Sequence, residues 1–256
     1  MTALLGALAR ARPWDAVGPS DAPAIVFLHG AILSRTMWRP QVERLADRYR
    51  CLTVDLPGHG VLAGQPYTVA AAVEVVRSAI VEGAGGRAVI AGLSLGGYSA
   101  IATAAASPEL VRGLVIAGAS MEPLGLARLG YLWYGWSLRL LPPGLVRHVG
   151  IALFRRAYGP AVGAAIAEGY DSRAGGVAVT RLVGERFGER LVRYGGPTLV
   201  INGELDLWFR LGERAFIAGA PNARVLRLAR ASHVSNLDQP DRFADAIAEF
   251  ERSLPA

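Results

Sequence analysis

The chain has 256 residues, of which 52% are hydrophobic and 19% charged, a composition typical of a globular protein with a sizeable core. Its one cysteine, Cys51, excludes an intramolecular disulfide and a thiolate-rich metal site, and we expect no metal. All 27 basic residues are arginine. The absence of lysine excludes a catalytic lysine, a Schiff base and a P-loop.

The net charge of +6 is concentrated in one segment of the chain. Residues 121–194 carry ten arginines against five acids, whereas the rest of the chain is close to neutral. No dense basic run or zinc-finger-like pattern is present, so we expect no nucleic-acid partner. We interpret the excess as a solvated arginine surface, with attraction to anionic substrates or to an acidic membrane surface as the alternative.

Hydropathy predicts a cytoplasmic protein without stable membrane insertion. No apolar run approaches the roughly 18 residues that a membrane span needs, and residues 129–138 are flanked by Arg128 and Arg139. The N-terminal stretch MTALLGALARAR has no positive residue before its apolar part, which makes it a poor secretory signal. We expect a monomer or a homodimer.

The order of the predicted elements indicates an α/β fold. Short apolar runs predict buried strands at 24–28, 51–54, 88–91, 113–118, 197–202 and 223–228. Apolar residues at helical spacing predict helices at 37–48, 67–81, 98–106 and 243–254. Alternation of the two predicts a mainly parallel sheet flanked by helices. Residues 121–194 hold no convincing strand and predict a helical insertion after the fourth buried strand.

The pentapeptide Gly92-Leu93-Ser94-Leu95-Gly96 is the first sign of chemistry. It matches G-x-S-x-G and stands between a predicted strand and a predicted helix, which is the context of a nucleophile elbow. Side chains at positions 92 and 96 would collide with neighbouring backbone in such a tight turn. We therefore expect Ser94 to be a nucleophile raised above the end of the sheet.

A serine hydroxyl is a weak nucleophile and needs a base. We expect this base to be His233, which follows the last predicted strand. His29 and His59 lie in loops after strands, where we interpret them as structural, and His148 is expected on the surface of the helical insertion.

The base in turn needs an acid to orient it. Asp206 follows the predicted strand at 197–202, and the order Ser94, Asp206, His233 matches the chain order of triads on α/β-hydrolase scaffolds. Glu204 and Glu122 are the alternative acids.

The chain resembles the α/β-hydrolase superfamily over nearly its whole length. The motifs that carry the resemblance are FLHG at 27–30, VDLPGHG at 54–60, GLSLGG at 92–97, NGELD at 202–206 and ASHVSNLDQP at 231–240. The resemblance implies that the backbone amides of Ala31 and Leu95 form an oxyanion hole. It also implies a core at 1–120 and 195–256, with a helical cap at 121–194 over the active site. Ser94 stands where the similar haloalkane dehalogenases and epoxide hydrolases use aspartate. About 23 residues precede the first buried run, so the leading hairpin of the family is expected to be short or incomplete.

These features predict a serine hydrolase that cleaves small to medium, largely apolar carboxylic esters through an acyl-enzyme, without a cofactor. The stretch HGAILSRTMW resembles enol-lactonases, so a lactonase is an alternative. A lyase or a cofactor-free haloperoxidase using the same triad, and a non-catalytic receptor, are further alternatives. Trp133 and Trp136 in the insertion are expected to contact substrate, although packing of the insertion against the core is the competing interpretation.

Overall fold

A computed structural model describes residues 12–255, so the N-terminal stretch considered as a signal lies almost wholly outside the described residues. The described residues contain a seven-stranded sheet of order β1-β3-β2-β4-β5-β6-β7. The strands are β1 (Trp14–Val17), β2 (Ala24–Leu28), β3 (Arg50–Val54), β4 (Ala88–Leu93), β5 (Val111–Ala117), β6 (Thr198–Gly203) and β7 (Ala223–Leu228). All neighbours run parallel except β1, which pairs antiparallel with β3. The predicted α/β-hydrolase sheet is thereby confirmed.

The sequence analysis expected a short or incomplete leading hairpin before β2 but assigned no strand there, and the structure has the short edge strand β1. It is four residues long and only Trp14 is buried, so it shows none of the continuous apolar character of the inner strands. Its backbone is satisfied by β3, in the register Trp14 to Val54. The pairing therefore comes from the tertiary neighbour and not from a local pattern.

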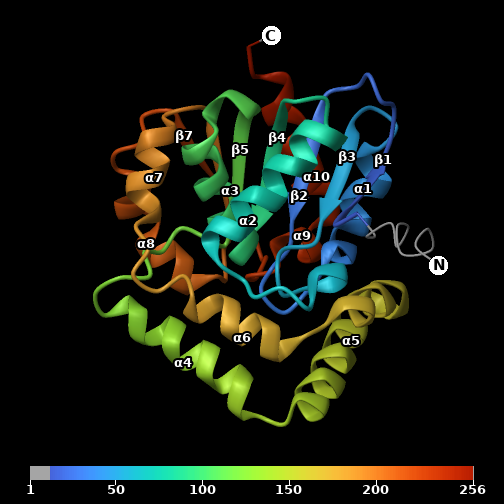
Figure 1. The fold of residues 1–256 in the computed structure, drawn as a ribbon, viewed down its shortest axis with the longest axis vertical. Helices are drawn as coiled ribbons and strands as arrows, with labels where there is room; N and C mark the ends of the chain where they lie inside the picture. The colour runs from blue at the N-terminus through green and yellow to red at the C-terminus, as the bar shows by residue number, and fades with distance from the viewer. Residues whose placement is uncertain (1–11, 256) are drawn as a thin grey trace, which may run out of the picture.

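Helices cover both faces of the sheet (Figure 1). On one face α2 (Val69–Ser78), α3 (Leu95–Ala106) and α7 (Phe187–Tyr194) pack over a cluster of buried apolar side chains. On the other face α1 (Arg39–Leu45) and α10 (Pro240–Arg252) enclose a second cluster. The inner strands β2 and β4 are buried along their whole length, as strands between two helical layers must be.

Four helices separate β5 from β6. These are α4 (Ala127–Leu140), α5 (Pro143–Gly169), α6 (Ser172–Thr180) and α7. α5 is interrupted at Gly159, which has a non-helical φ of 86° and directly precedes Pro160. α4, α5 and α6 lie across one end of the sheet, whereas α7 packs beside α3 (Figure 1).

Short elements complete the chain. They are η1 (Arg35–Trp38), η2 (Gly60–Leu62), η3 (Ala79–Gly83), η4 (Pro108–Leu110), α8 (Leu207–Ile217) and α9 (Ser235–Asp238). Within residues 12–255, every helix is too short or too polar to cross a bilayer.

Candidate active site

Ser94 stands on a strained turn between β4 and α3. Its φ of 54° is in the left-handed region that non-glycine residues rarely adopt. The turn is held by the Ser94 amide, which donates to Ala117 O at 2.7 Å on the adjacent strand. A Cβ on Gly92 would lie 2.3 Å from Gly96 O, and one on Gly96 would lie 2.1 Å from Leu28 O. Both glycines are therefore needed for the turn to close.

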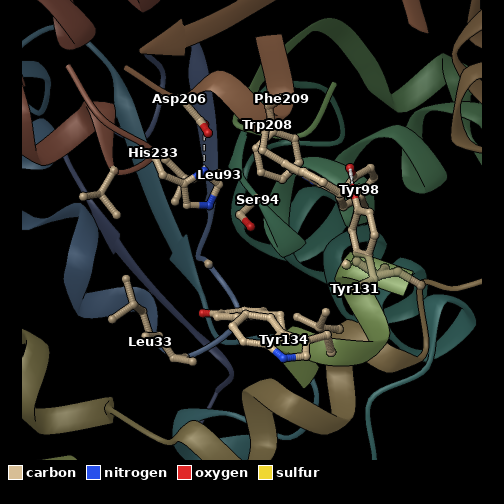
Figure 2. Close-up of a pocket in the computed structure, with 18 of the residues that line it drawn as sticks. Leu33, Leu93, Ser94, Tyr98, Tyr131, Tyr134, Asp206, Trp208, Phe209 and His233 are labelled. Carbon is tan, nitrogen blue, oxygen red and sulfur yellow. Dashed lines mark hydrogen bonds and ion pairs between the residues drawn. The ribbon is translucent and has the colours of Figure 1, made fainter. Parts of the chain in front are cut away.

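His233 and Asp206 form a hydrogen-bonded pair at the ends of two neighbouring strands. Asp206 follows β6 at the start of α8 and is 7% exposed, while His233 follows β7 and is 39% exposed. His233 Nδ1 donates to Asp206 Oδ2 at 2.8 Å. This contact fixes the ring tautomer and directs the other ring nitrogen toward the cavity that Ser94 faces (Figure 2).

Two neighbours hold the imidazole in this position, and the sequence analysis identified neither. Phe209 stacks on the His233 ring with centroids 5.0 Å apart and planes 18° from parallel. Gly118 follows β5 at a φ of 53°, and a Cβ there would stand 2.7 Å from His233 Cε1. A glycine at the end of a buried strand was the available signal for Gly118. The position of Phe209, three residues after Asp206, carries no comparable signal.

The loop that carries His233 is tied to α5. Asp238 accepts hydrogen bonds from the Ser232 amide at 2.5 Å and from the Ser232 hydroxyl at 2.7 Å. Its other oxygen accepts from the Tyr158 hydroxyl at 2.7 Å. Burial and the adjacent Asp238 raise the pKa of Tyr158, so this hydroxyl keeps its proton and donates. The Asp238 carboxylate thus links Ser232, the residue before His233, to Tyr158 on α5.

Ser94 and His233 both line a cavity of about 490 Å³ (Figure 2). Its walls are mostly apolar and aromatic and come from the strand ends, α4, α5, α6 and α8. They include Gly30, Ala31, Ile32, Leu33, Leu93, Tyr98, Gly130, Tyr131, Trp133, Tyr134, Phe154, Val179, Leu182, Trp208, Phe209 and Val234. Burial raises the pKa of Tyr98 and of Tyr131, so both hydroxyls stay neutral. Among the described residues no arginine lines this cavity, and its only acidic or imidazole side chains are those of Asp206 and His233.

Of the two residues expected to supply an oxyanion hole, Leu95 adjoins Ser94 in the chain and Ala31 lines the same cavity. Leu95 is the first residue of α3, so its amide has no acceptor within the helix. Ala31 lines the cavity on the loop after β2. His59 Nε2 is 2.5 Å from Ala31 O, which holds this loop in place.

The other histidines have structural surroundings. His29 is buried, accepts from the Leu56 amide at 3.0 Å through Nε2 and contacts Gly30 O through Nδ1. Burial, followed by the proximity of His59, holds the pKa of His29 well below its usual value. Burial also lowers the pKa of His59, although carbonyl oxygens at both ring nitrogens oppose the shift. His148 is exposed on α5.

The alternative acids are engaged elsewhere. Glu122 accepts from the amides of Phe187 and Gly188, and so caps the start of α7. Glu204 accepts from the Arg230 amide at 2.8 Å. The structure therefore brings Asp206, and neither glutamate, to His233.

The two tryptophans expected to bind substrate lie in different environments. Trp133 lines the cavity. Trp136 is not part of the cavity wall, and the Arg139 guanidinium covers its exposed ring at 4.7 Å from the centroid. Of the two tryptophans, the structure thus places only Trp133 at the candidate active site. No cluster of metal-ligating side chains is found within residues 12–255.

Comparison with protein families identifies the scaffold. The model described as "Alpha/beta hydrolase family" matches residues 25–246. The chain therefore belongs to the α/β-hydrolase family, as its motifs predicted.

Individual relatives cover almost the whole chain. A pimeloyl-[acyl-carrier protein] methyl ester esterase of Xanthomonas campestris is 31% identical, over 94% of this chain and 99% of the relative. A 3-oxoadipate enol-lactonase of Acinetobacter baylyi is 27% identical, over 93% and 91%. A solved esterase from Thermogutta terrifontis superposes with a TM-score of 0.76 at 25% identity, over 93% and 92%.

Proposed function

We propose that this member of the α/β-hydrolase family cleaves small to medium, largely apolar carboxylic esters through an acyl-enzyme on Ser94. Sequence similarity identifies the chain as a carboxylic-ester hydrolase, because the relatives above are named as an esterase and an enol-lactonase, and a lactone is a cyclic ester. The observation that supports the finer proposal is the convergence of Ser94, a hydrogen-bonded Asp206–His233 pair and an apolar cavity at one end of the sheet.

In the proposed mechanism Ser94 Oγ attacks the ester carbonyl while His233 Nε2 takes its proton. The proton then passes to the leaving alcohol, and water activated by the same nitrogen releases the acid and restores Ser94. Asp206 stabilises the imidazolium that forms in both steps. No hydrogen bond joins Ser94 to His233 in the described structure, a contact that often tightens only when substrate binds.

The amides of Ala31 and Leu95 are proposed to bind the oxyanion. The loss of one such donor typically raises the barrier by about 3 kcal/mol. The proposed cap is the helical insertion at 121–194, of which α4, α5 and α6 contribute cavity wall. The expected cytoplasmic location stays a prediction.

Neutral lactones are the second candidate substrate, favoured by the similarity to the enol-lactonase. The cavity wall, which has no arginine among the described residues, favours uncharged acyl groups over carboxylate-bearing ones for both substrate types. Lyase and haloperoxidase activities have no such observation in their favour.

The test is hydrolysis of p-nitrophenyl esters, from acetate to palmitate, by wild type, Ser94→Ala and Ser253→Ala. We expect Ser94→Ala to lower kcat by about 10⁴-fold or more and Ser253→Ala to change nothing. An alkyl fluorophosphonate should label wild type and Ser253→Ala but not Ser94→Ala. Turnover that survives in Ser94→Ala would refute the acyl-enzyme.

A further inference from the structure

An apolar stripe on α4 faces solvent. Its members are spaced by three, four, three and four residues, which places them on one side of a helix. They are Leu129, Trp133, Trp136 and Leu140 on α4, together with Leu126, which directly precedes the helix. Leu126 is 86% exposed, Leu140 76% and Trp133 73%. A regular stripe this exposed is unusual, because apolar positions at helical spacing normally face the core.

α5 also carries exposed apolar side chains at helical spacing. Leu145, Val149 and Leu153 are spaced by four residues, and all three are exposed. We call these residues and the α4 stripe together the α4–α5 face. The two helices form the end of the molecule farthest from the C-terminus (Figure 1).

The charge of this region has one sign. Residues 123–167 contain no aspartate or glutamate and carry five arginines, all exposed: Arg128, Arg139, Arg147, Arg155 and Arg156. Within the described residues none of the five forms an ion pair, whereas nine arginines elsewhere do. Arg147 donates to the carbonyls of Ala167 and Tyr170, and Arg139 covers the Trp136 ring, so these two charges are held at the surface without being neutralised. An exposed apolar face with nearby cations that have no carboxylate partner is matched by a partner that is apolar and negatively charged.

We infer that the α4–α5 face docks on an anionic lipid surface. A second copy of this chain fits poorly, because a symmetric interface would bring the same arginines toward each other without acids to offset them. Leucine and tryptophan beside arginine are the side chains that enter the boundary between headgroups and acyl chains. The protein would lie on the bilayer without spanning it.

The cavity meets this face. Trp133 belongs both to the exposed stripe and to the cavity wall, so docking would set the cavity opening close to the lipid. An uncharged, lipophilic ester dissolved in the bilayer could then enter the apolar cavity from the membrane side. Docking itself does not depend on catalysis, but this delivery of ester rests on the proposed function.

The test is flotation with vesicles of phosphatidylcholine, alone or mixed with phosphatidylglycerol. We expect wild type and Ser94→Ala to bind the mixed vesicles equally and the neutral ones far more weakly. Leu129→Gln/Leu140→Gln should reduce binding at least about tenfold. Val17→Gln/Val81→Gln, which alters two exposed aliphatic residues away from α4 and α5, should bind like wild type.

The arginines are tested in the same way. Arg155→Gln/Arg156→Gln should weaken binding on the order of tenfold at low salt and less at high salt. The control Arg242→Gln/Arg252→Gln changes two exposed arginines on α10 and should have a smaller effect. Hydrolysis of a soluble butyrate ester, unchanged in all four double variants, shows that each remains folded.

Three results would overturn the inference. They are failure of wild type to bind mixed vesicles, equal loss of binding in a control variant, and stripe-dependent capture of another partner without vesicle binding. The last result would assign the face to a second copy of the chain, seen by sedimentation, or to a small acidic protein. Because Ser94→Ala is assayed by binding alone, failure of the proposed function leaves this test intact.

Discussion

The candidate site and the α4–α5 face are built in opposite ways. Around His233 each contact is supplied by the chain itself: a carboxylate on one ring nitrogen, an aromatic ring on its face and a glycine that makes room. On the α4–α5 face the apolar side chains are exposed, and among the described residues its arginines have no carboxylate partner, although Arg139 covers the Trp136 ring and Arg147 donates to backbone carbonyls. The candidate active site is thus held in place by contacts within the chain. The α4–α5 face instead leaves apolar and cationic side chains exposed, where another surface can contact them.

The largest effect expected from this comparison is at Gly118. A Cβ at this position would push on the His233 ring, so Gly118→Ala should lower kcat on the order of 100-fold. Gly125 has the same φ of 53° but open space around it, so Gly125→Ala carries the backbone strain without the collision. Ester kinetics and thermal unfolding of both variants separate the two effects. Equal losses of activity would mean that the space at Gly118 does not position His233.

A smaller effect is expected at Asp238, which reaches His233 only through the backbone. In Asp238→Asn an amide replaces one of the two accepting oxygens, so either Ser232 or Tyr158 loses its acceptor. We expect kcat to fall about tenfold with KM little changed, because the cavity wall is intact. Asp241→Asn, on the exposed start of α10, is the matched control. A rise in KM alone would argue against a positioning role.

The two tryptophans of α4 sharpen the comparison within one helix. Trp133→Ala removes cavity wall and should lower kcat/KM for long-chain esters about fivefold, with little change for acetate. Trp136→Ala should leave all these esters unaffected. The chain-length profile of each variant is the measurement. Similar profiles for the two would show that Trp133 does not contact the acyl chain.

The smallest effect concerns stability against pH. The folded-state pKa values of His29 and His59 are both depressed by burial, so below about pH 6.5 the unfolded chain takes up protons that the two buried rings do not. The free energy of unfolding should therefore fall as pH falls, by up to about 1.4 kcal/mol per pH unit for each of the two histidines, until its folded-state pKa is reached. Unfolding midpoints across this range, with exposed His148→Gln as control, measure the slope. An NMR titration that finds His29 protonating at its ordinary pKa would contradict the account.

Local patterns sufficed for the inner sheet and for much of the site. Continuous apolar runs such as Ala24–Leu28 can be satisfied only by burial on both faces, so they mark inner strands without reference to the rest of the fold. The turn at Ser94 is equally local, because the glycines on either side relieve collisions that any such turn would create. Edge strand β1 was missed because its signal lies in its neighbour β3.

What the sequence by itself determined was the α/β-hydrolase fold, the strained turn at Ser94 and the concentration of arginine in one segment. Only the tertiary structure decided that Asp206 reaches His233 and the glutamates do not. It also decided that Gly118, Phe209 and Asp238 surround the ring, and that Trp133 meets the cavity while Trp136 faces solvent. The physical reason is range: a turn or buried strand is dictated by neighbouring residues, whereas a side chain's partner depends on which strand ends the sheet brings together.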